Sequence, residues 1–392
     1  MFSISLYLII FILIFIPYFL KVKFYGYDRL NVKNDNSING VRGILASLVM
    51  FSHVFKELYM YLGNQWIYNK NYFEFISFGN QATNTGKIGV AIFFMISGYL
   101  FYRLLDKNTL DIKVFFANRF YRIYPLYAFV ISICVLYIFL TGEEAINLVN
   151  LWETLKWYAF LGQYDEINIV EMTSGVEWTL KLEILMYTSI PVLFFLFSKT
   201  KNKIARHGFI IASILILFAL GFLLRIYGKV YIDPRAVLCF YIGYLALELK
   251  KYSVLDFFKT KLAAFISILL FISSFFVTSH NLFYLYIILS CGFGFICLSA
   301  GNTIFGLLKT PQLQKLGEIS YSIYLVHGLV LYFYMKLINY FAITNEVYLL
   351  FSVIILFFIT YSISSFTYLN IEQRFSQEKP LNKRLNANVN IN

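Results

Sequence analysis

Apolar stretches of 15 to 24 residues recur along the chain, and short segments rich in Lys, Arg, Asn and Asp separate them. An α-helix needs about 20 apolar residues to cross the roughly 30 Å of hydrocarbon in a bilayer. The pattern therefore predicts an all-α, polytopic transmembrane helix bundle. We expect eleven spans, at residues 3–20, 41–60, 88–105, 123–140, 175–197, 207–225, 235–249, 262–278, 283–300, 319–337 and 347–370.

The distribution of basic residues predicts how this bundle is oriented. If segment 21–42 faces the cytoplasm, the alternate connecting segments hold 24 of the 33 Lys and Arg residues. Cytoplasmic loops of membrane proteins carry such an excess, so we expect the amino terminus outside and the carboxyl terminus inside. The net charge of +12 then reflects this bias, and membrane lipids rather than nucleic acid are the expected surroundings.

Composition agrees with a membrane protein, because 59% of the 392 residues are hydrophobic and only 14% are charged. No repeat or linker divides the chain, so we expect one membrane domain over residues 40–374. Residues 1–20 lack the basic leader and cleavage site of a signal peptide, which predicts an additional, uncleaved N-terminal span. The polar residues 375–392 are expected to form a disordered cytoplasmic tail. The four cysteines have no CxxC spacing and no nearby histidine, so no metal site is expected.

Arg42 and His53 stand eleven positions apart in an otherwise apolar helix. Eleven residues make about three turns, so both side chains share one face and lie about 16 Å apart along the axis. In the predicted orientation Arg42 lies at the cytoplasmic edge and His53 lies inside the membrane. Ionisable groups cost several kcal/mol in hydrocarbon, which makes this pair a functional-site candidate.

A second candidate is the pair Arg119 and Arg122, one helical turn apart at the cytoplasmic entrance of a span. Two guanidinium groups on one face suit a phosphate, although ordinary positive-inside anchoring also explains them. Glu183 is expected about 12 Å below the outer surface, where a carboxylate needs a partner such as His53 or an arginine. A structural hydrogen bond between helices is the alternative for Glu183.

The segment LGEISYSIYLVH adds Ser320, Tyr321 and His327. Ser320 and His327 are two turns apart and share a face, so both can line the same passage as His53. Hydrogen bonding between helices explains these three residues equally well. A base in the membrane with arginines on the inner side suits group transfer from an anionic cytoplasmic donor, and it suits proton-coupled transport as well.

Taken together, the motifs resemble acyltransferase family 3 of bacterial membrane proteins. The resemblance runs from Gly40 to about Arg374. It rests on the Arg-x10-His helix, GVAIFFMISGYLF, Arg119-x-x-Arg122 before Ile-Tyr-Pro, the segment Trp178 to Glu183, FYIGYLALE and LGEISYSIYLVH. It implies a ten-helix core, to which the first span is an addition, in the inner (cytoplasmic) membrane of a bacterium. Thr179 replaces the usual serine, and Lys181 stands where an apolar or small residue is common.

The activity implied by the resemblance is O-acyl transfer, most often of acetyl from acetyl-CoA, to a hydroxyl of an extracytoplasmic or lipid-linked polysaccharide. His53 would be the catalytic base, oriented by Glu183. Arg42, Arg119 and Arg122 would bind the donor, and Ser320, Tyr321 and His327 would line the passage. Acetyl-CoA would be a co-substrate, with no metal involved. Because no SGNH-type domain follows the last span, a separate extracytoplasmic transferase is a conceivable partner, and the oligomeric state stays open.

A proton-coupled transporter or exporter of a glycan or small molecule is the main alternative function. Such proteins typically show inverted repeats and helices broken at matching positions. No such pairing is visible in the sequence, which contains only six prolines. Whether His53 acts as a base or carries the acyl group is open as well.

Overall fold

The computed structural model describes residues 23–32, 35–62, 78–106, 110–143, 147–162, 169–227, 233–277 and 281–377. Within these ranges the chain forms helices joined by turns, with no β-strand. The predicted first span at 3–20 lies outside the described residues. So does most of the predicted tail, although residues 375–377 belong to helix α16 (Gln373–Gln377) and are ordered.

Ten helices overlap the other ten predicted spans. They are α2 (Ser37–Tyr61), α3 (Phe78–Asp106), α4 (Ile112–Thr141), α7 (Glu177–Lys199), α8 (Lys203–Ile226), α9 (Val237–Leu249), α11 (Lys261–Phe275), α12 (Asn281–Ser299), α14 (Ser320–Tyr340) and α15 (Glu346–Thr367). In the described residues, seven helices are long and apolar enough to cross a membrane, and the apolar helices in α9, α11 and α12 are shorter. The chain is therefore an all-α membrane protein, while the count of eleven spans and the orientation stay predictions.

Polar side chains define where several of these helices begin. The side-chain oxygens of Asn36, Asp111, Asn202 and Asn345 each accept a hydrogen bond from a backbone N–H in the following turn. The cap at Asp111 explains one difference from the prediction, because α4 begins at Ile112 rather than near residue 123. The polar residues of its first turns, including Arg119, had interrupted the apolar pattern.

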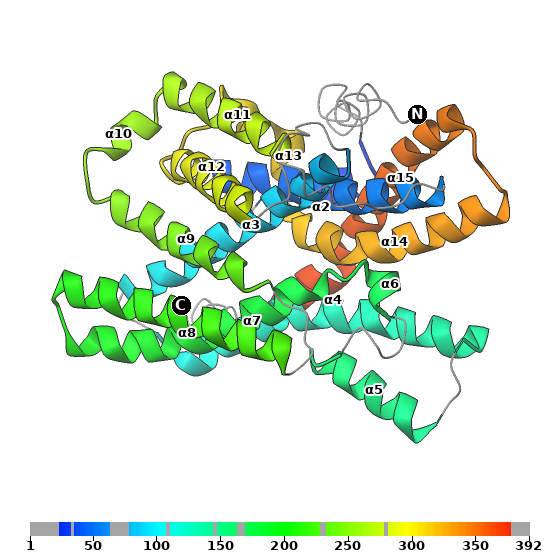
Figure 1. The fold of residues 1–392 in the computed structure, drawn as a ribbon, viewed down its shortest axis with the longest axis horizontal. Coiled ribbons are helices and arrows are strands. Elements are labelled where there is room, and N and C mark those ends of the chain that lie inside the picture. Colours follow the sequence, from blue (N-terminus) through cyan, green and yellow to red (C-terminus); the bar gives the residue numbers. More distant parts are fainter. Residues whose placement is uncertain are drawn as a thin grey trace, which may run out of the picture.

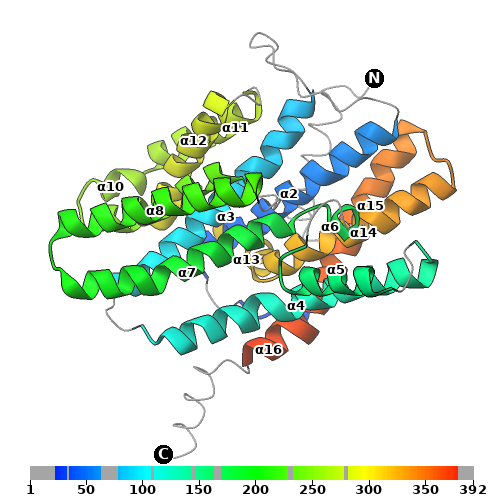
Figure 2. The same cartoon turned by 60° about the horizontal axis from the view of Figure 1, so that its bottom comes forward.

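Helices α2 and α3 form the centre of the bundle, with α9 packed on α3 and α14 packed on α2 (Figure 1). The pairs α7 and α8, α11 and α12, and α14 and α15 are helical hairpins arranged around this centre (Figure 2). Glycines allow α3 and α9 to approach closely, since a Cβ atom at Gly98 would lie 2.3 Å from the Phe240 carbonyl oxygen. Small residues serve this purpose in membrane helix interfaces.

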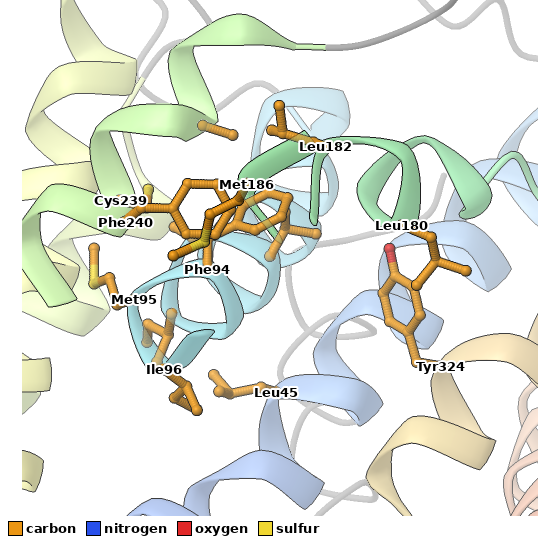
Figure 3. Close-up of a cluster of buried hydrophobic side chains, with 14 of the residues drawn as sticks. Leu45, Phe94, Met95, Ile96, Leu180, Leu182, Met186, Cys239, Phe240 and Tyr324 are labelled. Atoms are coloured by element: carbon orange, nitrogen blue, oxygen red, sulfur yellow. The ribbon is translucent and has the colours of Figure 1, made fainter. Parts of the chain in front are cut away.

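The core between α3, α7 and α9 is apolar and rich in aromatic side chains. Phe94 packs against Phe240 with ring centroids 5.0 Å apart, and Met186 lies beside them (Figure 3). All three side chains are buried. On the other side of this core, Leu180 of α7 and Tyr324 of α14 lie close together (Figure 3). This packing fixes the faces of α3, α7 and α14 that line the cavity described next.

Candidate active site

A cavity of about 460 Å³ lies between α2, α3, α4, α7 and α14. Its volume falls within the range typical of small-molecule sites. Six of the eight predicted site residues line it, although they come from four helices that are far apart in the sequence. These six are Arg42, Arg119, Arg122, Glu183, Ser320 and Tyr321.

The first turn of α2 forms part of the cavity wall and is held by the short helix α13 (Pro311–Glu318). Asn39 donates through Nδ2 to the Gln314 backbone oxygen at 3.0 Å and to Gln314 Oε1 at 2.9 Å. Gln314 in turn donates to the backbone oxygens of Asn36 and Leu308. A Cβ atom at Gly40 would lie 2.0 Å from the Leu308 oxygen, so only glycine fits this contact. The network fixes the start of α2, one turn before Arg42.

The three arginines carry unused hydrogen-bonding capacity into this cavity. Arg42 and Arg122 make no hydrogen bond or ion pair with any residue that the structure describes. The guanidinium of Arg119 lies over the ring of Phe101, with 5.0 Å between Cζ and the ring centroid, and its Nε is buried without an acceptor. Buried donors without acceptors cost free energy, which an anionic ligand would recover.

Glu183 lines the same cavity and accepts hydrogen bonds from two hydroxyl groups. The donors are Ser97 Oγ at 3.1 Å and the Tyr187 hydroxyl at 2.5 Å. Arg119 interacts with it electrostatically. In the described part of the chain Glu183 has no contact with His53, so the expected orienting contact is not formed here. Of the two partners predicted for this carboxylate, the structure favours the arginine.

Arg42 has two acidic neighbours, one after the last long helix and one at the end of α13. Glu372 and Glu318 both interact with it electrostatically. Glu372 closes the π-helical turn η4 (Tyr368–Glu372) and accepts a hydrogen bond from Ser322 Oγ at 3.2 Å. π-Helical turns often occur at functional sites because they re-aim side chains. The turn thus places a carboxylate near the first arginine of the cavity.

His53 faces His327 across the interface of α2 and α14, with ring centroids 5.3 Å apart. The Nδ1 of His327 lies 3.1 Å from the Ile323 carbonyl oxygen. A carbonyl only accepts, so Nδ1 carries the hydrogen and Nε2 presents a lone pair. That Nε2 is buried and has no partner among the described atoms. The two histidines, which were expected to line one passage, therefore lie directly beside each other.

Neither histidine of the pair lines the cavity. Tyr324 lines the cavity on one side, and on the other its ring lies 6.1 Å from that of His327. Its hydroxyl pairs with Thr179 Oγ1 at 2.8 Å, and its ring lies 6.1 Å from Phe93. We call Phe93, Thr179 and Tyr324 the tyrosine layer.

Sequence reasoning missed several lining residues. Lys250 and Arg103 extend the basic lining beyond the three predicted arginines, and Lys250 donates through Nζ to the Tyr99 hydroxyl. Lys250 and Arg103 both lie in basic segments on the predicted inner side, where the sequence alone does not distinguish them from anchoring charges.

Lys181 points away from Glu183, because two residues make about 200° of helix rotation, and it donates to the Gly162 carbonyl at 2.6 Å. No cluster of three or more metal-ligating side chains occurs in the described ranges.

Parts of the chain are similar in sequence to known proteins. An Acidianus two-tailed virus protein, named provisionally as an acetyltransferase, is 36% identical over 111 residues, which is 28% of this chain and 31% of that protein. Acyltransferase MdmB of Streptomyces mycarofaciens is 29% identical over 120 residues, 30% of each chain. Nodulation protein 10 of Rhizobium leguminosarum bv. viciae is 25% identical over 185 residues, 43% of this chain and 46% of that protein.

The chain thus matches between about a third and a half of the length of these relatives. No solved structure matches it significantly. The model of the acyltransferase 3 family, described as an acyltransferase domain, matches residues 35–368. This range contains the cavity arginines, Glu183 and the histidine pair. The chain therefore belongs to acyltransferase family 3.

Proposed function

We propose that this protein moves an acyl group, with acetyl as the first candidate, from cytoplasmic acyl-CoA to a hydroxyl of an extracytoplasmic or lipid-linked polysaccharide. It would work in the inner membrane of a bacterium, with the amino terminus outside and the carboxyl terminus inside. The family supports acyl transfer in a membrane protein. The observation that supports the finer proposal is a cavity lined by Arg42, Arg119 and Arg122, in which the Nε of Arg119 is buried without an acceptor among the described atoms.

The cavity suits the anionic part of a CoA donor. A guanidinium fork matches the oxygens of a phosphate, and three such groups with Lys250 supply charge for a pyrophosphate and a further phosphate. Glu183 and Glu372 lie among these arginines and keep part of the positive charge balanced when no donor is bound. The acyl arm would then extend past Tyr324 towards His53.

The histidine pair suits the chemical step. His53 would remove the proton from the acceptor hydroxyl as the thioester carbonyl is attacked, and the CoA thiolate would leave towards the arginines. Alternatively, His53 would take the acyl group first and pass it to the hydroxyl. In both routes His327 would be a positioning residue, because its ring lies 5.3 Å from that of His53 while its Nδ1 is held by the Ile323 carbonyl oxygen.

The test is His53→Ala in purified, membrane-reconstituted protein supplied with labelled acetyl-CoA and surface glycan. Loss of general-base help should reduce transfer by about 10²- to 10⁴-fold. His207→Ala is the matched control, since His207 bonds the Tyr244 hydroxyl at 3.0 Å, away from the cavity. Normal transfer by a folded His53→Ala variant would refute the role of His53.

The same assay separates the enzyme from the transporter alternative. Transfer of label to glycan, with release of free CoA, supports the acyltransferase. Movement of a glycan across the membrane without consumption of the donor would support the transporter. Mass spectrometry of glycans from cells with and without the protein would then identify the modified sugar.

A further inference from the structure

Two basic side chains, Lys87 and Arg235, share one aromatic ring at the end of the bundle opposite the arginine-lined mouth. The Nζ of Lys87 lies 5.7 Å, and the Cζ of Arg235 4.6 Å, from the ring centroid of Tyr284. In the predicted orientation this end faces outward, where only nine of the 33 Lys and Arg residues fall. Positive-inside anchoring therefore does not explain them.

The two cations of this group differ in their described partners. Asp233 pairs with Arg235 through two hydrogen bonds, from Nε to Oδ1 at 2.9 Å and from Nη2 to Oδ2 at 2.7 Å. Lys87 interacts electrostatically with both, yet it forms no hydrogen bond or ion pair with a described residue. The Lys87 ammonium is half-buried and has three donors. We call Lys87, Asp233, Arg235 and Tyr284 the outer cation cluster.

Along α3, Lys87 lies just beyond the residues that line the cavity. Val90 is the lining residue nearest to the amino end of α3. Lys87 precedes it by three residues, about 4.5 Å along the helix axis. Gly86 packs on α2 beside Ser52, where an added Cβ atom would lie 2.9 Å from Oγ. Since Ser52 precedes His53, Lys87 is level with the histidine pair along the bundle.

We propose that the outer cation cluster binds a carboxylate or phosphate group of the acceptor glycan. This inference rests on the proposed function and specifies its acceptor as anionic. Lys87 would donate hydrogen bonds to the anion and Arg235 would add positive potential, while Tyr284 keeps both cations in place from below. Binding of the anion here would bring a neighbouring sugar hydroxyl towards His53.

The test uses the full chain in phosphatidylcholine nanodiscs, with D-glucuronic acid and glucose as probes of binding. The wild type should bind glucuronate in preference to glucose. Lys87→Gln should weaken glucuronate binding by about tenfold or more, and Lys87→Arg should restore most of it. Lys336→Gln is the control, because that lysine is also on the predicted outer side but pairs with Glu143 at 3.4 Å.

Three results would overturn the inference. They are equal binding of glucuronate and glucose by the wild type, equal weakening by the Lys336→Gln control, and displacement of glucuronate by phosphatidylglycerol in the nanodisc, which would indicate a lipid site. The preference of the wild type is informative even if Lys87→Gln fails to fold. CoA binding, measured in the same preparation, separates the two proposals. A protein that does not bind CoA would refute the proposed function. A protein that binds CoA but shows no preference for glucuronate would refute this inference alone.

Discussion

Replacing Arg119 with lysine should weaken CoA binding while preserving the charge. The guanidinium of Arg119 is held between Phe101 and Phe115, with Cζ 5.0 and 5.9 Å from their ring centroids, and its Nε has no described acceptor. It is thus ordered before the ligand arrives, and little side-chain entropy is lost on binding. Lysine would lose the planar fork and with it about one charge-assisted hydrogen bond to phosphate, worth about 1.5–3 kcal/mol.

That loss corresponds to a roughly 10- to 150-fold increase in the Kd for CoA, measured by isothermal titration calorimetry on purified protein. Arg206→Lys is the matched control. Arg206 also lies 5.0 Å from a phenylalanine ring, but its donors are satisfied by the backbone oxygens of Thr200 and Phe197. If Arg119→Lys bound CoA as tightly as the wild type, or both variants weakened it equally, the phosphate clamp would be refuted.

Two further predictions concern the packing around the cavity. In a thermal unfolding assay, Gly40→Ala should lower the free energy of unfolding by about 1–3 kcal/mol or more, because the added Cβ would meet the Leu308 oxygen. Gly208→Ala is the control. No atom lies within 4 Å of a Cβ at Gly208, so this variant should be neutral or stabilising. Tyr324→Ala should open the tyrosine layer and raise acceptor-independent release of CoA from acetyl-CoA, whereas Tyr324→Phe keeps the ring and should not. Equal release by both Tyr324 variants would contradict a barrier role for the ring.

Sequence patterns predicted the helices better than they predicted the contacts between them. The length and apolarity of a span are local properties, so α2, α14 and most other helices were located correctly. The start of α4 was misplaced, because Arg119 and its polar neighbours break the apolar run although the helix continues through them. Arg42, Arg119 and Arg122 line one cavity, while the donor-binding role that the family resemblance implies for them stays a prediction.

The partners of individual side chains depended on tertiary packing. Glu183 was expected beside His53, but the rotation of α7 directs it to Ser97 and Tyr187, and His327 lies beside His53 instead. Spacing within one helix gives the face on which a residue lies. It does not say which other helix that face meets. A shared passage for His53 and His327 could therefore be expected, but their direct contact could not.

The tyrosine layer also bears on the electrical properties of the membrane. A water-filled path from the arginine-lined cavity past the histidines would let protons and ions leak across, each charge losing about 2.3 kcal/mol per 100 mV of membrane potential. Phe93, Thr179 and Tyr324 interrupt that path with two aromatic rings and a hydroxyl whose hydrogen bond is already satisfied. In the proposed reaction the acyl group has to pass a barrier that stays closed to ions, so the three side chains would have to part around the acyl chain and close behind it.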